Sequence, residues 1–108
     1  MARPRNYNPL VYVVNQWNLS RARNKGEKQF KSYLRNCGSN YIKRLEVRQC
    51  ILDKYHHQCA ECKATQNLQV DHIISVYQGW KQGLDIEVIN TLENLQILCR
   101  SCNAGKLP

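Results

Sequence analysis

The sequence predicts a small α+β domain, with basic helices in its N-terminal part and a short two-stranded hairpin followed by a helix in its C-terminal part. Three observations lead to this prediction. Apolar residues recur at helical spacing through the first half of the chain, two short runs rich in branched residues follow, and two Cys-x-x-Cys pairs flank those runs. With 108 residues, the chain has the length of one domain.

The composition excludes several classes of protein. Hydrophobic residues make up 43% of the chain and charged residues 22%, which is typical of a globular domain rather than a disordered one. The longest apolar run, residues 10–14, is too short for a membrane-spanning helix or a secretory signal. We therefore expect a cytoplasmic protein. Cysteines in a reducing compartment bind metal more often than they form disulfides.

Positive charge is concentrated near the N-terminus. The formal net charge is +8, and ten of the 16 Lys and Arg residues lie within residues 1–45, beside a single acid, Glu27. This asymmetry favours a surface for a polyanion such as DNA, although a solvated face that keeps the protein soluble would have the same pattern. The candidate nucleic-acid-binding residues in and near this region are Arg21, Arg23, Lys43, Arg44 and Arg48.

Three helices are expected in the first half of the chain. The first covers residues 8–17, where Asn-Pro is a suitable helix start, although the branched run at 11–14 would equally suit a strand. The second covers residues 30–37 and ends at Gly38, and the third covers residues 40–55. The weakest point in this region is the Asn-Lys-Gly sequence that ends at Gly26.

Two Cys-x-x-Cys pairs, Cys59/Cys62 and Cys99/Cys102, form the most specific pattern in the sequence. Two such pairs complete a tetrahedral zinc site. Four protein ligands leave no position for water, so we expect one structural Zn²⁺ that adds folding energy to a small core. One pair alone would also suit a redox site, and either histidine before the first pair could replace a thiol.

A hairpin is expected between the two cysteine pairs. Residues 68–74 alternate and are rich in branched side chains, residues 95–99 form a second strand, and residues 100–106 form a short helix. The 19 residues from 75 to 93 are expected to form a long loop, and Asn90 with Glu93 has the spacing of a helix capping box.

The ordered set of motifs resembles the HNH endonucleases, which are ββα-metal or His-Me finger nucleases. The resemblance covers residues 44–106, so we expect a basic, mainly helical extension over residues 1–43 and one HNH nuclease domain over residues 44–108. Small free-standing proteins of this kind are common in phages and prophages. The motifs that carry the resemblance are Cys59-x-x-Cys62, Asp71-His72-Ile73-Ile74, Glu93-Asn94-Leu95-Gln96-Ile97-Leu98-Cys99, Cys102-Asn103 and Lys106.

The resemblance implies a role for each matched residue. His72 matches the general base that activates water, and Asp71 and Asn103 match the ligands of a catalytic Mg²⁺ or Mn²⁺. Asn94 matches the asparagine that fixes the loop and orients the histidine, and Lys106 matches a basic position that meets a phosphate. General chemistry agrees, because imidazole titrates near neutrality and a hard ion on oxygen ligands neutralises charge on a phosphate.

The adjacent positions of Asp71 and His72 set a geometric condition. Adjacent side chains of a regular strand point to opposite faces. Both can reach one phosphate only if the strand bends or ends there, so we expect a bulge or the start of the loop at His72.

The sequence therefore predicts a metal-dependent endonuclease that hydrolyses DNA phosphodiester bonds, nicking or cutting both strands, with no membrane partner. Two alternatives stay open. One is a zinc-containing module that binds DNA without cutting it, and the other is an inactive member of a phage packaging complex. A pure binding module has no need of Asp71, His72 and Asn103 together.

Overall fold

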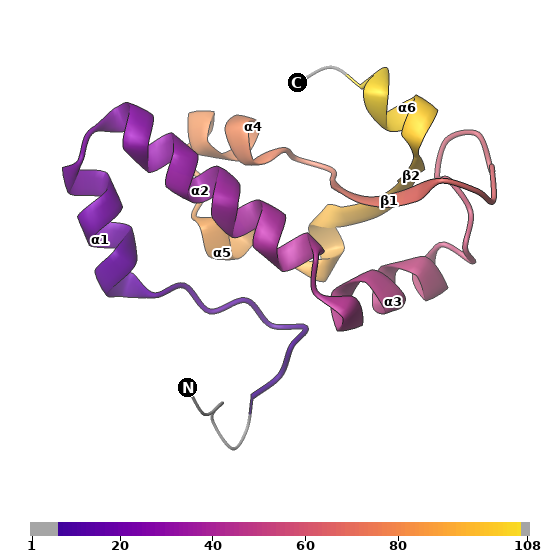
Figure 1. Cartoon of the computed structure of the whole chain (residues 1–108), viewed down its shortest axis with the longest axis horizontal. Helices are drawn as coiled ribbons and strands as arrows, with labels where there is room; N and C mark the ends of the chain where they lie inside the picture. Colours follow the sequence, from indigo (N-terminus) through magenta and orange to yellow (C-terminus); the bar gives the residue numbers. More distant parts are fainter. Residues whose placement is uncertain (1–6, 107–108) are drawn as a thin grey trace.

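The computed structural model describes residues 7–106 and consists of helices around one small sheet (Figure 1). Strands β1 and β2 pair antiparallel, from Leu68 opposite Cys99 to His72 opposite Leu95. With α6 they form the expected ββα unit, preceded by basic helices. In chain order the elements are α1 (Gln16–Asn24), α2 (Glu27–Ile42), α3 (Leu45–Lys54), β1 (Leu68–His72), α4 (Val76–Lys81), α5 (Ile86–Ile89), the 3-10 turn η1 (Leu92–Asn94), β2 (Leu95–Cys99) and α6 (Arg100–Ala104).

The first helix begins later than the sequence predicts. The side-chain oxygen of Asn8 accepts from the N–H of Leu10 at 3.0 Å, but this closes a turn rather than a helix. The chain is then extended, and α1 starts only after Asn15, which caps the N–H of Asn18. The branched and aromatic side chains at 11–14 favour extended backbone, and here they decide the local structure.

The extended segment is held by residues far along the chain. The hydroxyl of Tyr41 donates to the carbonyl oxygen of Leu10 at 2.5 Å. The guanidinium of Arg44 donates to the carbonyl oxygens of Pro9 (2.9 Å) and Val11 (3.1 Å). These contacts satisfy backbone groups that pair with neither strand.

Gly38 does not end a helix as predicted, because α2 continues through it to Ile42. A Cβ at Gly38 would lie 2.5 Å from Cγ2 of Val76 and 3.3 Å from Cε1 of His72. The glycine therefore permits α2 to approach the end of β1 closely. It ends no helix.

The helix predicted over residues 40–55 is divided in two. The chain leaves α2 after Ile42, and Arg44, in extended conformation, precedes α3. The predicted break before Gly26 is confirmed, since α1 ends at Asn24 and Gly26 adopts φ 102°.

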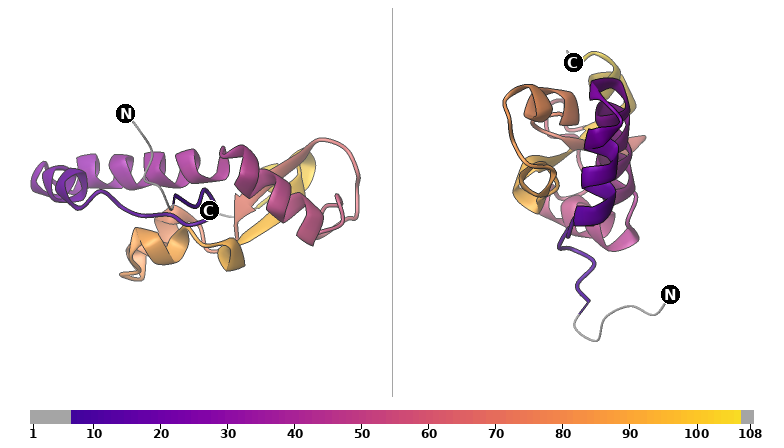
Figure 2. Two further views of the ribbon diagram at one scale, coloured as in Figure 1. Left: turned by 90° about the horizontal axis from the view of Figure 1, so that it is seen from below. Right: turned by 90° about the vertical axis from the view of Figure 1, so that its left-hand side faces the viewer.

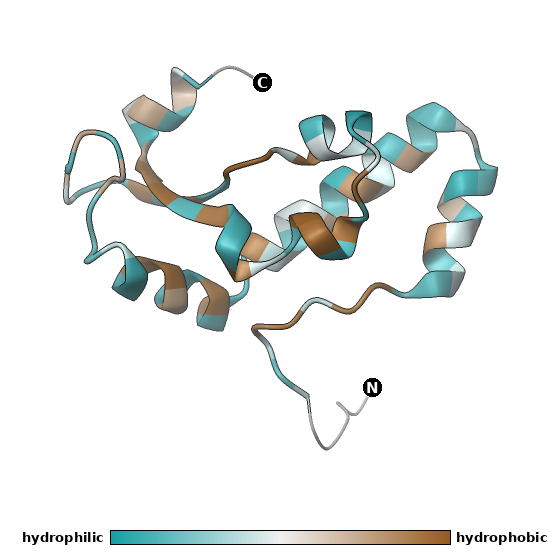
Figure 3. Cartoon of the chain, turned by 180° about the vertical axis from the view of Figure 1, so that it is seen from behind, coloured by the Kyte–Doolittle hydropathy of each residue, from teal (hydrophilic) through white to brown (hydrophobic). Residues whose placement is uncertain are grey.

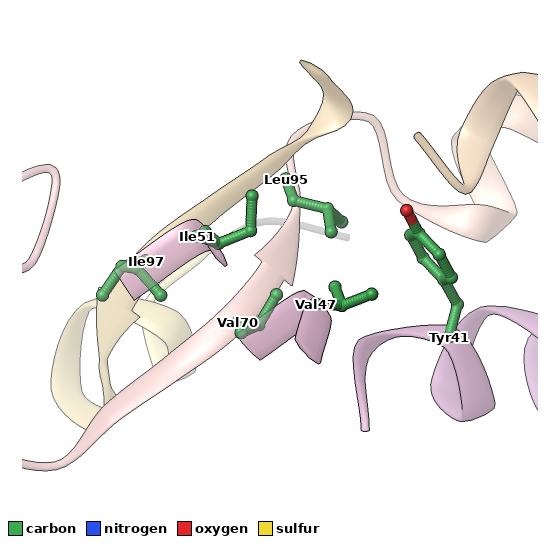
Figure 4. Packing of buried hydrophobic residues seen from close by; sticks show 6 residues of the cluster. All are labelled: Tyr41, Val47, Ile51, Val70, Leu95 and Ile97. Atoms are coloured by element: carbon green, nitrogen blue, oxygen red, sulfur yellow. The ribbon is translucent and has the colours of Figure 1, made fainter. Parts of the chain in front are cut away.

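Two main clusters of buried side chains support these elements. The first lies between α3 and one sheet face, where Val47 and Ile51 meet Val70, Leu95 and Ile97, with Tyr41 at its edge (Figure 4). The second joins α2 to α5 and the extended segment; its members are Val14, Leu34, Cys37, Ile86 and Ile89. Seen from below, α2 lies along one side of the molecule, with α4 and α5 on the other (Figure 2).

The predicted loop over residues 75–93 contains most of three short helical elements, α4, α5 and η1. The capping box is at Ser75 and Gln78 at the start of α4, and not at Asn90 and Glu93. Hydropathy follows this arrangement, because α5, the strands and the extended segment carry the apolar residues while α1 is largely hydrophilic (Figure 3). Within residues 7–106, no helix combines the length and apolar character needed to cross a membrane.

Candidate active site and metal centre

His72 is the last residue of β1 and is buried, with 7% of its surface exposed. The strand ends there without a bulge, because the pairing of His72 with Leu95 continues the regular register. Burial lowers the pKa of the imidazole, an effect that the hydrogen bond it donates to Asn90 opposes. The ring is therefore neutral near neutral pH, which is the form that a general base requires.

Asn90 fixes the proton on the His72 ring. Its Oδ1 lies 2.9 Å from His72 Nε2, and its Nδ2 donates to the carbonyl oxygen of Cys37 at 3.2 Å. Because that carbonyl can only accept, the amide oxygen faces the imidazole, and Nε2 must carry the hydrogen.

The other ring nitrogen of His72, Nδ1, is thus unprotonated. No buried side-chain nitrogen or oxygen of the described residues lacks a hydrogen-bond partner. Since no bond to Nδ1 is found, this atom must be reached by solvent. A water molecule can therefore meet a proton acceptor at the end of β1.

Asp71 lies on the opposite face of the sheet, as strand geometry requires. Its Oδ2 accepts from Nζ of Lys106 at 2.6 Å and from Nε2 of Gln96, its cross-strand partner, at 3.2 Å. The same Lys106 ammonium donates to the backbone oxygen of His72 at 2.5 Å. Lys106 thereby places a positive charge at the edge where the two faces meet.

Asn103, on α6, shares this face with Asp71. Its Nδ2 donates to Oε1 of Gln69 at 2.7 Å, and Gln69 stands two residues before Asp71 on the same side of β1. The amide oxygen of Asn103 and the carboxylate of Asp71 are both hard oxygen donors, which suits Mg²⁺ or Mn²⁺. The chemistry of this donor pair fits a divalent ion, with Lys106 as the cation beside the carboxylate in this structure.

Asn94 clamps the chain where it leaves β1. Its Oδ1 accepts from the N–H of Ile74 at 2.8 Å, and its Nδ2 donates to the carbonyl oxygens of Ile74 (3.0 Å) and Ile89 (2.9 Å). The backbone oxygen of Asn94 also accepts from Ile73 at 2.7 Å. These bonds fix the two residues after His72.

The four paired cysteines form one cluster. The Sγ atoms of Cys59, Cys62, Cys99 and Cys102 all lie within 4.8 Å of one another, and those of Cys62 and Cys99 are 3.6 Å apart. A tetrahedron with Zn–S bonds of about 2.3 Å has edges of about 3.8 Å, so the cluster fits one Zn²⁺. The two histidines before Cys59 are not part of it, and His57 bonds to Asp53 at 3.0 Å.

Hydrogen bonds already favour one thiolate in this cluster. Burial raises the pKa of the Cys59 thiol, but backbone hydrogen bonds from Cys62, Cys99 and Glu61 have the larger combined effect. The net result is a pKa lowered to about 6. A thiolate is the form that binds metal. This pKa supports a metal centre and does not favour an inert buried thiol.

The basic residues singled out from the sequence have varied surroundings. Arg44 supports the extended segment, and Arg48 donates to the carbonyl oxygen of Leu68 at 3.3 and 3.4 Å. Lys43, Arg21 and Arg23 are exposed, and the two arginines on α1 lie over the rings of Trp17 (4.7 Å) and Phe30 (5.1 Å). Contact of these residues with DNA stays a prediction.

Sequence reasoning missed Asn90, Gly38 and Gln96 as parts of the site. Asn90 meets His72 across 18 residues and Gly38 meets it across 34, so no local pattern marks either. Gln96 could have been found, because pairing the two predicted strands places it opposite Asp71.

Comparison with known proteins assigns the C-terminal part of the chain. Residues 59–107 match the family model described as HNH endonuclease. The matched segment contains both cysteine pairs, both strands and α6. No curated protein and no solved structure matches the chain.

Proposed function

We propose that this chain, which matches the HNH endonuclease model over residues 59–107, is a metal-dependent endonuclease that hydrolyses DNA phosphodiester bonds. The observation that carries the proposal is the end of β1, where a neutral imidazole held through Nε2 adjoins a carboxylate paired with a cation. Hydrolysis of a phosphodiester needs a base for water and positive charge at the phosphate. Both occur here at the end of β1, where His72 supplies the base and Lys106, bonded to Asp71 and to the His72 carbonyl, supplies the charge.

His72 acts as the general base. Its Nδ1 takes a proton from a water molecule that attacks the phosphorus, while Asn90 keeps Nε2 protonated and the ring oriented. The P–O bond to the leaving oxygen breaks as the new one forms, and the leaving oxygen takes a proton from solvent. Asn94 holds residues 73 and 74 so that the ring keeps its place at the strand end. Because burial lowers the pKa of His72, the imidazole stays neutral, and able to act as a base, at a lower pH than an ordinary histidine.

Asp71 and Asn103 hold the divalent ion, Mg²⁺ or Mn²⁺, which supplies charge neutralisation at the phosphate and at the leaving oxygen when it is bound. Lys106 then leaves Asp71 and is available to a phosphate oxygen, for which an ammonium is suited. The thiol cluster holds a structural Zn²⁺ and takes no part in the reaction.

The test is cleavage of supercoiled plasmid by wild-type protein and by His72→Ala, with Mg²⁺, Mn²⁺ or EDTA. We expect cutting that needs the divalent ion and falls about 10²- to 10⁴-fold in the variant, with DNA binding retained. His57→Ala is the matched control, because His57 is an exposed histidine bonded to Asp53.

Two outcomes would contradict the proposal. Wild-type protein that binds DNA but leaves it intact with every divalent ion would support the alternative of a catalytically silent binding module or packaging accessory protein. Equal cutting by His72→Ala and wild type would remove His72 as the base.

A further inference from the structure

A second surface next to the candidate active site combines basic and aromatic side chains. We call it the α2–α4 groove. It is a hollow of about 140 Å³ between the two helices, which lie side by side in Figure 1. The lining residues are Lys31, Leu34, Arg35, Val76, Tyr77 and Trp80.

The groove carries positive charge and no acid in its lining. Lys31 and Arg35 supply this charge, and Nζ of Lys31 lies 4.8 Å from the ring centroid of Trp80. Lys81, which does not line the groove, lies with its Nζ 5.9 Å from the ring centroid of Tyr77. The larger hollow between α1 and α2, of about 460 Å³, differs because Asp85 and Glu87 line it. Only the α2–α4 groove of these two suits a polyanion.

The two aromatic rings of the groove differ in their surroundings. Trp80 packs against the second core cluster and is only partly exposed. Tyr77 belongs to no core cluster, is 50% exposed and lies 6.1 Å from Trp80, centroid to centroid, at an interplanar angle of 35°. Tyr77 therefore presents a half-exposed ring that contacts Trp80 and Lys81 but belongs to no core cluster.

The groove lies close to the end of β1. Val76 lines it and is also the nearest neighbour of Gly38, and Gly38 in turn lies against the His72 ring. Arg35 stands three residues before Gly38 on α2, one helical turn away. A nucleotide in the groove would thus neighbour a phosphate at His72.

We propose that the α2–α4 groove binds an unstacked nucleotide of a single-stranded DNA segment beside the phosphate that is cleaved. Tyr77 stacks on the base, and Lys31 and Arg35 meet its phosphate. Within a duplex, a base is covered by its neighbours and cannot offer its face to Tyr77, so the substrate class is DNA with unpaired nucleotides. This inference rests on the proposed endonuclease function for its placement.

The reason for this occupant is the combination of groups. Proteins that bind single strands pair a positive groove with aromatic rings, because every base has a face that can stack. An unpaired nucleotide uses both kinds of group in one groove, because its phosphate can meet Lys31 and Arg35 while its base stacks on the ring of Tyr77.

The experiment measures binding by fluorescence anisotropy without added Mg²⁺ or Mn²⁺ and without chelator, so that the structural zinc is kept, with a labelled oligothymidine and with a labelled duplex. The protein is the full chain loaded with Zn²⁺. We expect Tyr77→Ala to weaken oligothymidine binding by about 5- to 100-fold, which is the range for loss of one stacked base, and to leave duplex binding unchanged. Tyr77→Phe keeps the ring and should bind as wild type.

Trp17→Ala is the control, because Trp17 is another exposed aromatic (66%) beside a cation, Arg21, but lies outside the groove. It should leave oligothymidine binding unchanged. Arg35→Gln should lower the salt dependence of single-strand binding by about 0.7 in log–log slope. The fold of each variant is checked by circular dichroism.

Oligothymidine binding by Tyr77→Ala equal to wild type would overturn the proposal, as would an equal loss for oligothymidine and duplex. Because no cleavage is measured, the outcome is separate from that of the plasmid assay. Tyr77-dependent single-strand binding by a protein that cuts nothing would support the groove and contradict the endonuclease.

Discussion

Asn90 determines which nitrogen of His72 can accept a proton, although it lies 18 residues away in the sequence. Its hydrogen bond raises the pKa of the imidazole, against the lowering by burial. Replacing Asn90 therefore removes both the orientation of the ring and part of what keeps the ring protonated at low pH.

We expect Asn90→Ala to lower kcat and to move the acidic limb of the pH–rate profile to lower pH. The direction follows because loss of the bond lowers the pKa of His72 further, so the base stays neutral in more acidic solution. The measurement is plasmid cleavage across a pH series. A fall in rate with an unmoved acidic limb would show that Asn90 only supports the fold.

The variant Gly38→Ala tests whether α2 must approach the end of β1 closely. Gly38→Ala places a Cβ 2.5 Å from Val76 and 3.3 Å from His72, so a side chain must move. We expect a loss of about 1–3 kcal/mol in the free energy of unfolding, measured by urea denaturation.

Gly105→Ala is the matched control for Gly38→Ala. The nearest atom to its Cβ is at 3.6 Å, an ordinary contact, and its φ of −83° suits alanine. Its stability should stay within about 0.5 kcal/mol of wild type. Equal stability of Gly38→Ala and wild type would mean that α2 and α4 can separate freely.

The two cysteine pairs join separate elements of the fold. Cys59 and Cys62 lie in the turn before β1, while Cys99 ends β2 and Cys102 lies on α6. One ion on all four thiols therefore ties three segments together. The short helix α6, five residues long, depends on this for its position over β1.

We expect native mass spectrometry to find one Zn²⁺ per chain, and Cys62→Ser to lose the metal and unfold the domain, because structural zinc supplies folding energy directly. Cys50→Ser is the control, since Cys50 is partly buried but stands outside the cluster. A folded, metal-free Cys62→Ser protein would contradict a structural role for the ion.

The elements that sequence reasoning found are those fixed by local chemistry. The two strands and the following helix are marked by alternation and by the cysteine spacing; β2 has the predicted bounds, while β1 and α6 begin where expected and each end two residues earlier. The start of the first helix and the role of Gly38 were wrong, because contacts with Leu10 and His72 from distant residues decide them. Distant partners of this kind leave no local pattern in a sequence.

The candidate site was foreseen in part for the same reason. Asp71, His72, Asn94 and Asn103 stood in recognisable motifs, and the structure places them around the end and one face of β1. Their catalytic roles stay predictions, as does the domain boundary after residue 43. Asn90 was taken for a helix cap, because an exposed cap and a buried partner of histidine have the same side chain.

At the scale of the whole molecule, the positive charge of the N-terminal region is the feature to test. Part of it is committed to structure, because Arg44 holds the extended segment and Arg48 caps a β1 carbonyl. Deleting residues 1–25 would also remove Val14 from the second core cluster. Replacing exposed charges is therefore a cleaner test than truncation.

We expect Arg21→Gln, Arg23→Gln and Lys25→Gln together to weaken duplex binding alike for all sequences. The log–log salt dependence should fall by about 0.9 for each charge that meets a phosphate. The control replaces Lys54 and Lys63, which are exposed outside this region. If the three α1 replacements leave the salt dependence of duplex binding unchanged, the excess charge serves solubility and not DNA binding.

The extended segment before α1 has a consequence for local opening of the protein. Its backbone pairs with neither strand and is held by Tyr41 and Arg44, 31 to 35 residues away, so it can detach without breaking a helix or the sheet. Detachment would nevertheless withdraw Val14 from the second core and uncover α2 and α5. A protease that cuts in residues 8–13 would thereby loosen the helices that support His72, while leaving every residue of the candidate site in the chain.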